Sequence, residues 1–314
     1  MDPSHDFLAQ YKAITSKLKK RFLRKPNVAE ASAQFSMLAK ELQNRECPHY
    51  AAFVCLAVCR CEHSVGNPIF ESQNLLHAAK LFLEAEQLDH ELLCPGYSEH
   101  LQASINAYHD CIKVHLDHDQ PALAASLYLE LGQALRQLGR VREAIPHFLQ
   151  AANLHRFCAL DHVNDLTLVY ECRIAVGDYD GALSALTQMQ VICEKQGVKE
   201  NYERIGAFTA ILRETEITRL LLLLYLKPPP IKLKPEHAKL LDRYASLDTD
   251  SVSYIEEDLY LMLQSLMIAV NEKDEDALSK LEKDIWPYLS GLQNNILNRI
   301  VTDFRSYSFL VPYK

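Results

Sequence analysis

The chain has 314 residues, of which 48% are hydrophobic and 24% charged, and its formal net charge is −8. This acidic balance argues against general nucleic-acid binding, which needs a basic surface. The uncharged run between Arg219 and Lys227 holds only seven residues, whereas a membrane-spanning helix needs roughly 20 apolar residues, so we expect no membrane insertion. The N-terminus lacks an apolar export segment, and we therefore expect the nine cysteines to be reduced thiols inside the cell.

The composition predicts an all-α chain. Only 9 glycines occur, and the abundant Leu, Ala, Gln, Glu and Lys are good helix formers. Proline and glycine punctuate the chain at intervals of roughly 15–25 residues, as a row of helical hairpins requires. In chain order, breaks are expected at residues 47–48, 66–68 and 95–96, with helices between them. Asp119 is then expected to cap the start of the next helix.

The clearest repeats lie within residues 120–196. The segment YLELGQALRQLGRVREAIPHFLQAA has tetratricopeptide spacing, with the small residues Gly132 and Ala151 where two helices press together and Gly139 at the turn. A related unit has Gly177 at its turn, 38 residues after Gly139, which is near the usual period of about 34. Two successive units predict a tetratricopeptide-like helical-hairpin solenoid, a right-handed superhelix, that forms a single domain over residues 1–314.

A long helix is predicted at about residues 203–226, and its end, LLLLLYL, is apolar on every side. Such an end must be covered all round, either by the rest of the fold or by a partner. We expect it to pack within the solenoid. The proline-rich connection at 227–235 then stops the helix and leads into C-terminal helices over residues 236–314, which carry an acidic face.

Signals for catalysis, cofactors or metals are weak. The chain has no glycine-rich phosphate-binding motif and no G-x-S-x-G motif, so we expect neither enzymatic activity nor a cofactor. Cys55, Cys59 and His63 share one helix face, as zinc ligands could. Their spacing differs from the usual C-x2-C pair, and cysteine is among the most commonly buried residues. We interpret the two cysteines as core thiols and predict no metal site.

The two ends of the chain carry opposite charge. Residues 1–25 hold seven basic and two acidic residues, a net charge of +5, whereas residues 248–284 hold three basic and eleven acidic residues, a net charge of −8. Such asymmetry orients partners. The run KLKKRFLRK has three interpretations: a solvated helix face, a contact with an acidic partner, or a nuclear-import signal. The basic candidates for partner contact are Lys17, Lys19, Lys20, Arg21, Arg24 and Lys25.

Three segments together resemble one protein family. They are SKLKKRFLRKPNVAEA, RLLLLLYLKPPPIKLKPEHA and LQSLMIAVNEKDEDALSKLEKDIWPYL. They look like the family of the forty-kilodalton huntingtin-associated protein, also called the factor VIII intron-22 protein family, and the likeness covers nearly the whole chain. Vertebrate members have a long insert rich in proline and alanine where this chain has only the short connection at 197–203. The lack of this insert would fit an invertebrate ortholog.

The resemblance implies a non-catalytic scaffold that binds huntingtin, a very large HEAT-repeat protein, one to one and stabilises it. It also implies a cytoplasmic protein that associates with early endosomes through the small GTPase Rab five and acts in vesicle motility, and a nuclear pool is a further expectation. The runner-up interpretation is a vesicle-fusion adaptor that resembles the soluble NSF attachment proteins, which are also helical-hairpin solenoids.

The same resemblance implies that the C-terminal part meets a basic surface of huntingtin. The acidic candidates for that contact are Glu256, Glu257, Asp258, Asp274, Glu275 and Asp276. Apolar residues near the end of the chain are expected to be exposed and to be covered by the partner. These apolar candidates are Phe309, Leu310 and Val311.

Overall fold

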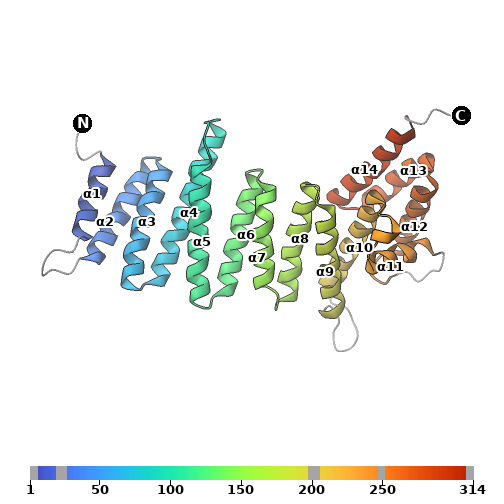
Figure 1. Ribbon diagram of the computed structural model, residues 1–314, viewed down its shortest axis with the longest axis horizontal. Coiled ribbons are helices and arrows are strands. Elements are labelled where there is room, and N and C mark those ends of the chain that lie inside the picture. The colour runs from blue at the N-terminus through green and yellow to red at the C-terminus, as the bar shows by residue number, and fades with distance from the viewer. Residues whose placement is uncertain (1–5, 19–26, 197–205, 247–251, 309–314) are drawn as a thin grey trace. The chain divides into compact units, whose positions relative to one another are not determined.

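The computed structural model describes residues 6–18, 27–196, 206–246 and 252–308, in which all regular structure is helical and no strand occurs (Figure 1). Its contacts divide the chain into two compact units, Met1–His155 and Arg156–Lys314. Each unit is described in turn. The prediction of an all-α chain is confirmed, and the prediction that residues 1–314 form a single domain stays a prediction.

The first unit is a row of seven helices in which each helix packs against the next. The helices are α1 (Phe7–Leu18), α2 (Val28–Asn44), α3 (Pro48–Val65), α4 (Pro68–Glu91), α5 (Glu99–Asp117), α6 (Pro121–Gln137) and α7 (Val141–Leu154). Three of them begin at a proline, whose fixed φ suits the first helical turn and whose missing N–H is not needed there. The expected breaks at 47–48 and 66–68 coincide with the starts of α3 and α4, and the break at 95–96 falls between α4 and α5.

Five helices of this row, α2 to α6, end in one recurrent turn. A residue in the left-handed conformation closes the helix, and the next backbone N–H donates to the carbonyl five residues earlier. Gly139 takes this position after α6 with φ 74°, and the Arg140 N–H donates to the Leu135 carbonyl at 2.9 Å. Asp119, expected as an N-cap, instead takes the same position after α5 with φ 56°. The sequence-based assignment of Asp119 was wrong because α6 begins two residues later, at Pro121.

The core of the first unit lies between the two helices of each hairpin. In the α6–α7 hairpin, the ring of Phe148 lies against the backbone of Gly132, where no other residue would leave it room, and Ala151 is fully buried. Leu131, Leu135 and Phe148 are fully buried in the same hairpin. The tetratricopeptide pattern therefore corresponds to real interhelical packing.

The second unit starts with the hairpin of α8 (Ala159–Ala175) and α9 (Tyr179–Gln196), with Gly177 in the left-handed conformation at its turn. The remaining α-helices are α10 (Gly206–Leu226), α11 (Pro235–Ala245), α12 (Glu257–Glu272), α13 (Glu275–Ile285) and α14 (Gly291–Ser308). Short 3-10 helices lie at Pro230–Lys232 and Trp286–Tyr288. In contrast to the row of the first unit, α14 packs back on α10, so α10 contacts α9, α11 and α14.

The leucine run lies at the centre of this second bundle. Leu220, Leu221, Leu222, Leu223 and Leu224 are each at most 4% exposed. Three helices contact α10, and a helix end that is apolar all round needs such cover from its neighbours. The expectation that this end packs within the fold is confirmed. Within the described ranges, no helix is long and apolar enough to cross a bilayer.

Candidate partner-binding surfaces

The basic N-terminal candidates are described only in part. Lys17 lies in the last turn of α1, where its Nζ is 3.2 Å from Glu30 Oε1 and 2.9 Å from Gln34 Oε1, both on α2. This amine therefore joins two neighbouring helices of its own unit. The other basic candidates, Lys19, Lys20, Arg21, Arg24 and Lys25, lie outside the described residues, as do the apolar candidates Phe309, Leu310 and Val311.

The six acidic candidates are all exposed, and all lie at helix starts. Glu256, Glu257 and Asp258 begin α12, and Asp274, Glu275 and Asp276 begin α13. A carboxylate at a helix N-terminus is stabilised by the unpaired N–H groups and by the helix dipole. Asp274 shows this directly, because its Oδ1 accepts a hydrogen bond from the Ala277 N–H at 3.0 Å. These residues therefore have a structural role of their own.

The acidic candidates form two clusters rather than one face. The first begins α12, and the second follows directly after its last residue, Glu272. A helix of 16 residues, at about 1.5 Å per residue, places the two clusters roughly 24 Å apart. A partner would therefore have to meet them at two separate points. The charge count over residues 248–284 could not reveal this separation, because a count does not say how far apart the charges lie in space.

A buried ionic network that was not predicted from the sequence lies just before the leucine run on α10. Glu216 on α10 is 1% exposed and accepts hydrogen bonds from Arg243 Nη1 at 2.9 Å, Tyr244 Oη at 3.0 Å and Tyr254 Oη at 2.6 Å. Burial raises the pKa of both tyrosines, and the nearby carboxylate of Glu216 raises it further. The two phenols therefore remain donors at neutral pH. Three donors hold one buried charge and tie α10, α11 and the residues before α12 together.

A buried cation lies one turn further along α10. Arg219 is 1% exposed, and its Nη2 lies 3.1 Å from Nδ1 of His237 on α11. Burial lowers the pKa of His237, and the positive charge of Arg219 lowers it further. The imidazole is therefore neutral and can accept this hydrogen bond. The only sequence signal was the presence of charged residues within the helix that ends in the leucine run, which does not by itself indicate burial.

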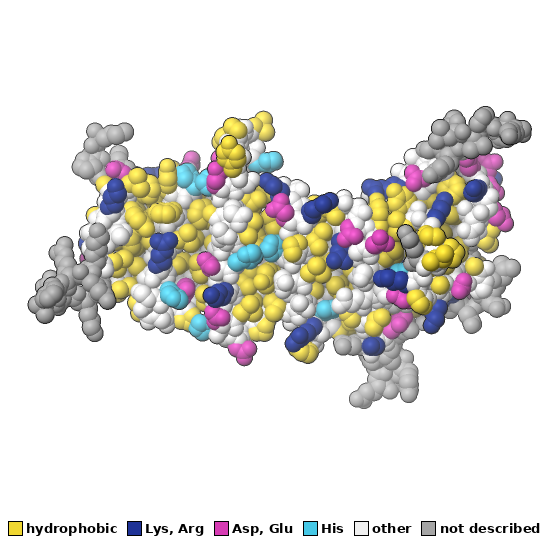
Figure 2. Space-filling model, viewed as in Figure 1, with side chains coloured by type: hydrophobic (Ala, Val, Ile, Leu, Met, Phe, Trp, Pro, Cys, Tyr) yellow, Lys and Arg dark blue, Asp and Glu magenta, His cyan; other side chains and the backbone are white. Residues whose placement is uncertain are grey.

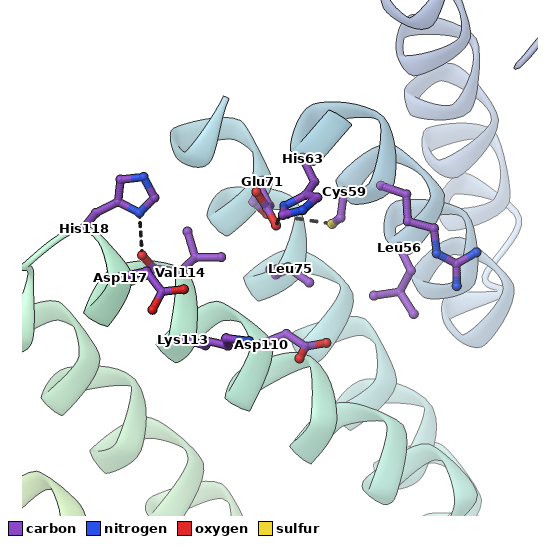
Figure 3. Close-up of a pocket in the computed structure, with 11 residues that line it drawn as sticks. Leu56, Cys59, His63, Glu71, Leu75, Asp110, Lys113, Val114, Asp117 and His118 are labelled. Atoms are coloured by element: carbon purple, nitrogen blue, oxygen red, sulfur yellow. Dashed lines mark hydrogen bonds and ion pairs between the residues drawn. The ribbon is translucent and has the colours of Figure 1, made fainter. Parts of the chain in front are cut away.

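A charged hollow with a volume of about 490 Å³ lies in the first unit and is formed by α3, α4 and α5 (Figure 3). On one wall His63 Nδ1 lies 2.9 Å from Glu71 Oε1, and Asp110 and Lys113 come from α5 on the other wall. The lining residues are Leu56, Cys59, Arg60, His63, Glu71, Leu75, Asp110, Lys113, Val114, Asp117 and His118. Because both signs of charge are present, the hollow favours no single class of charged ligand.

The thiols near this hollow are core groups. Cys55 and Cys59 are 2% and 5% exposed, and Cys59 Sγ donates to the Glu71 backbone carbonyl at 3.7 Å. Burial raises the pKa of Cys55 to about 11 and raises that of Cys59 as well. Both thiols therefore stay protonated at neutral pH, whereas a cysteine nucleophile must be a thiolate. Across the described ranges, no three His, Cys, Asp or Glu side chains are grouped closely enough to hold a metal ion.

Comparison with known proteins identifies two relatives of this chain. No protein-family model matches the chain. The 40-kDa huntingtin-associated protein of Rattus norvegicus is 38% identical over 355 aligned positions, which cover 95% of this chain and 92% of the rat protein. The protein of the same name from Mus musculus is 37% identical with the same coverage. The alignments are longer than the 314 residues of this chain, so both relatives contain residues that it lacks.

Identity at this level extends across both units of the fold rather than over the tetratricopeptide-like repeats alone. A generic repeat pattern would match over the hairpins of residues 120–196 and would leave the C-terminal bundle unmatched. The chain therefore belongs to the family of the 40-kDa huntingtin-associated protein.

Proposed function

We propose that this protein binds huntingtin in a one-to-one complex, as a non-catalytic partner that stabilises it. The observation that carries this proposal is the 38% identity over 95% of the chain to a relative named for its association with huntingtin. The aligned part includes residues of both compact units, so the surfaces that each unit presents share an origin with those of the relative.

The architecture supports a binding role. A row of helical hairpins buries its core between neighbouring helices and leaves long continuous faces open to a macromolecular partner. In such interfaces buried apolar area and fit supply most of the affinity, and charge sets register and association rate. The two exposed acidic clusters at the starts of α12 and α13 suit that second role toward a basic surface.

The direct test is co-expression with huntingtin from the same organism, followed by size-exclusion chromatography with light scattering. We expect a single peak whose mass equals one copy of each chain. The peak should persist in high salt, because apolar burial is not screened by ions. Separate elution of the two chains at micromolar concentration would disprove the proposal.

We further propose a cytoplasmic protein that is recruited to early endosomes through the small GTPase Rab five. The support for this step is family membership. The test compares binding of the GTP-loaded and GDP-loaded GTPase to the purified complex and to each component alone. We expect retention of the GTP-loaded form by the complex, and equal retention of the two nucleotide states would contradict it.

A further inference from the structure

The α4–α5 hairpin ends in an apolar knob. Leu92, Leu93 and Tyr97 lie in the turn after α4 and are 72%, 87% and 95% exposed, and Leu88 on the last turn of α4 is also exposed. Cys94 is exposed beside them. α4 has 24 residues against 18 in α3 and 19 in α5, and Figure 2 shows hydrophobic side chains gathered where the end of this hairpin projects. The knob is defined as Leu88, Leu92, Leu93, Cys94 and Tyr97.

The backbone of the knob is held in shape by hydrogen bonds. The Leu93 N–H donates to the His90 carbonyl at 3.2 Å, and the Cys94 N–H donates to the Asp89 carbonyl at 2.8 Å. At the far side of the turn, the Tyr97 N–H donates to Glu99 Oε2 at 3.1 Å. An apolar projection that is already ordered loses little conformational freedom when it is buried by a partner, which favours binding.

Leu93 occupies a position that usually holds glycine. Its φ is 52°, in the left-handed region that closes several other helices of the first unit. Only glycine takes this conformation without steric cost, yet here a leucine side chain takes it and is left in solvent. The strain brings no packing to the chain itself, which points to a use of this side chain outside the chain.

The charges around the knob indicate what it meets. From Leu81 to Ile112 the chain has no lysine or arginine. Five carboxylates lie within residues 84–99: Glu84, Glu86, Asp89, Glu91 and Glu99. Glu86 accepts a hydrogen bond from the Leu101 N–H, and Asp89 lies 3.6 Å from His100. Arg140, from the turn before α7, donates to Ser98 Oγ at 2.8 Å, so the carboxylates outnumber the basic groups around the knob. An apolar centre with an acidic rim is complementary to an apolar hollow with a basic rim. It is the wrong sign for an anionic membrane surface, which attracts lysine and arginine.

We propose that the knob inserts into an apolar hollow rimmed by lysine and arginine on huntingtin, and that it anchors the complex. This inference rests on the proposed function and names a contact within it that lies far in sequence from both charged ends of the chain. Exposed apolar side chains on a rigid projection are suited to filling a pocket, and a few pocket-filling residues, among which tyrosine is enriched, carry most of the affinity of an interface.

The sharpest variant is Leu93→Gly. Glycine keeps the left-handed turn and removes only the apolar side chain, so a loss of binding cannot be attributed to a lost turn. Asp119→Gly is the matched control, because Asp119 takes the same backbone position after α5 with φ 56° and carries no apolar side chain. A second variant, Leu92→Ser/Tyr97→Ser, removes the rest of the knob, and Met37→Ser controls for loss of an apolar side chain that is 65% exposed elsewhere in the unit.

Binding of each variant to purified huntingtin is measured by surface plasmon resonance, with far-UV circular dichroism as the check on folding. We expect Leu93→Gly to weaken binding at least about tenfold and the double variant by more, as for a pocket-filling anchor. The two controls should bind within about twofold of wild type, which is the range of interface residues that contribute little. If wild type binds huntingtin and both knob variants bind it with the same affinity, the inference is overturned and the proposed function stands. If wild type does not bind huntingtin, the proposed function is overturned.

The rim is tested with Glu84→Lys/Glu91→Lys. We expect slower association at low salt and a smaller difference at high salt, because rim charges act mainly on the association rate and are screened by ions. An unchanged rate at low salt would overturn the basic rim. Two other occupants have their own signatures. Loss of self-association on Leu93→Gly would indicate a second copy of the chain, and loss of sedimentation with phosphatidylserine vesicles would indicate a lipid surface; either result with unchanged huntingtin binding would overturn the inference.

Discussion

The ring of Phe148 lies directly against the backbone of Gly132. A methyl group added at position 132 would come within 2.6 Å of Phe148 Cε1 and 2.9 Å of Cδ1, both far shorter than a normal contact between carbon atoms. Phe148 is fully buried, so its ring cannot move out into solvent. This contact therefore limits the size of the residue that α6 can carry at position 132.

We expect Gly132→Ala to destabilise the protein by about 1–3 kcal/mol, the usual cost of overpacking a core. The clash outweighs the gain in helix propensity, which is about 1 kcal/mol. Urea unfolding measures the change. Gly291→Ala is the matched control, because a methyl group there would meet nothing within 4 Å.

The packing explanation also predicts a rescue. In the double variant Gly132→Ala/Phe148→Leu, the smaller side chain makes room for the added methyl group. We expect the double variant to lose less free energy of unfolding than the two single variants combined, with a coupling of about 0.5–3 kcal/mol. Strict additivity would show that the two positions do not compete for space.

Removing the buried carboxylate of Glu216 should be among the most damaging single changes. Glu216→Ala leaves the Arg243 guanidinium and two phenols without their shared acceptor, and the loss of one member of a buried ionic group costs about 3–5 kcal/mol. Tyr254→Phe removes one donor of three and should cost about 1–2 kcal/mol. Thermal and urea unfolding test the order, and a Tyr254→Phe variant less stable than Glu216→Ala would contradict it.

The imidazole of His147 should make the first unit sensitive to acid. Burial, and then the charge of His109 with its ring centroid 5.4 Å away, lower the pKa of His147 from 6.5 to about 4, and Glu143 partly opposes the shift. The unfolded chain takes up this proton near pH 6.5, and the folded chain only near pH 4. The unfolded state therefore binds more protons in this window, and stability falls as the pH is lowered through it.

His147→Gln removes that titration. We expect the free energy of unfolding of wild type to drop by about 1–2 kcal/mol more than that of the variant between pH 6.5 and pH 4.5, after allowance for the partial solvent screening of this side chain. Urea unfolding at the two pH values measures the difference. Equal losses in wild type and variant would show that His147 is protonated in the folded state.

The acidic start of α13 should act on the rate at which huntingtin associates. Reversal of Glu275 and Asp276 to lysine changes the local charge by four units and leaves the Asp274 cap in place. We expect several-fold slower association at low salt, an effect that disappears at high salt because exposed charges are screened. The variant should also lose about 0.3–1 kcal/mol of stability per residue through the helix dipole.

Asp274 needs separate treatment because it caps the helix. Asp274→Lys would remove the hydrogen bond to the Ala277 N–H at 3.0 Å and would confuse a stability change with a binding change. Asp274→Asn keeps an N-cap acceptor and removes one charge, and it should slow association less than the double reversal. Equal association rates for all variants at low salt would remove α13 from the contact.

Local sequence patterns predicted much of the fold. The helix breaks near Pro48, Pro68 and Pro95, the turn at Gly139 and the buried leucine run all follow from residues close together in sequence, since helix propensity, turn conformation and apolar periodicity act over a few turns. Asp119 was assigned to the wrong helix end because aspartate is common both as an N-cap and in the left-handed conformation of a turn. The family was visible in three segments, and the comparisons confirmed it.

The functional surface needed the folded chain. Nothing in the residues around Glu216 shows that Arg243 and Tyr254 approach it from later segments and make its burial stable. Likewise, the acidic candidates look continuous in a charge count, but the length of α12 separates them. The exposure of Leu93 also depends on where the turn after α4 places it. Burial and exposure depend on which distant segments meet a residue, and local sequence does not contain that information.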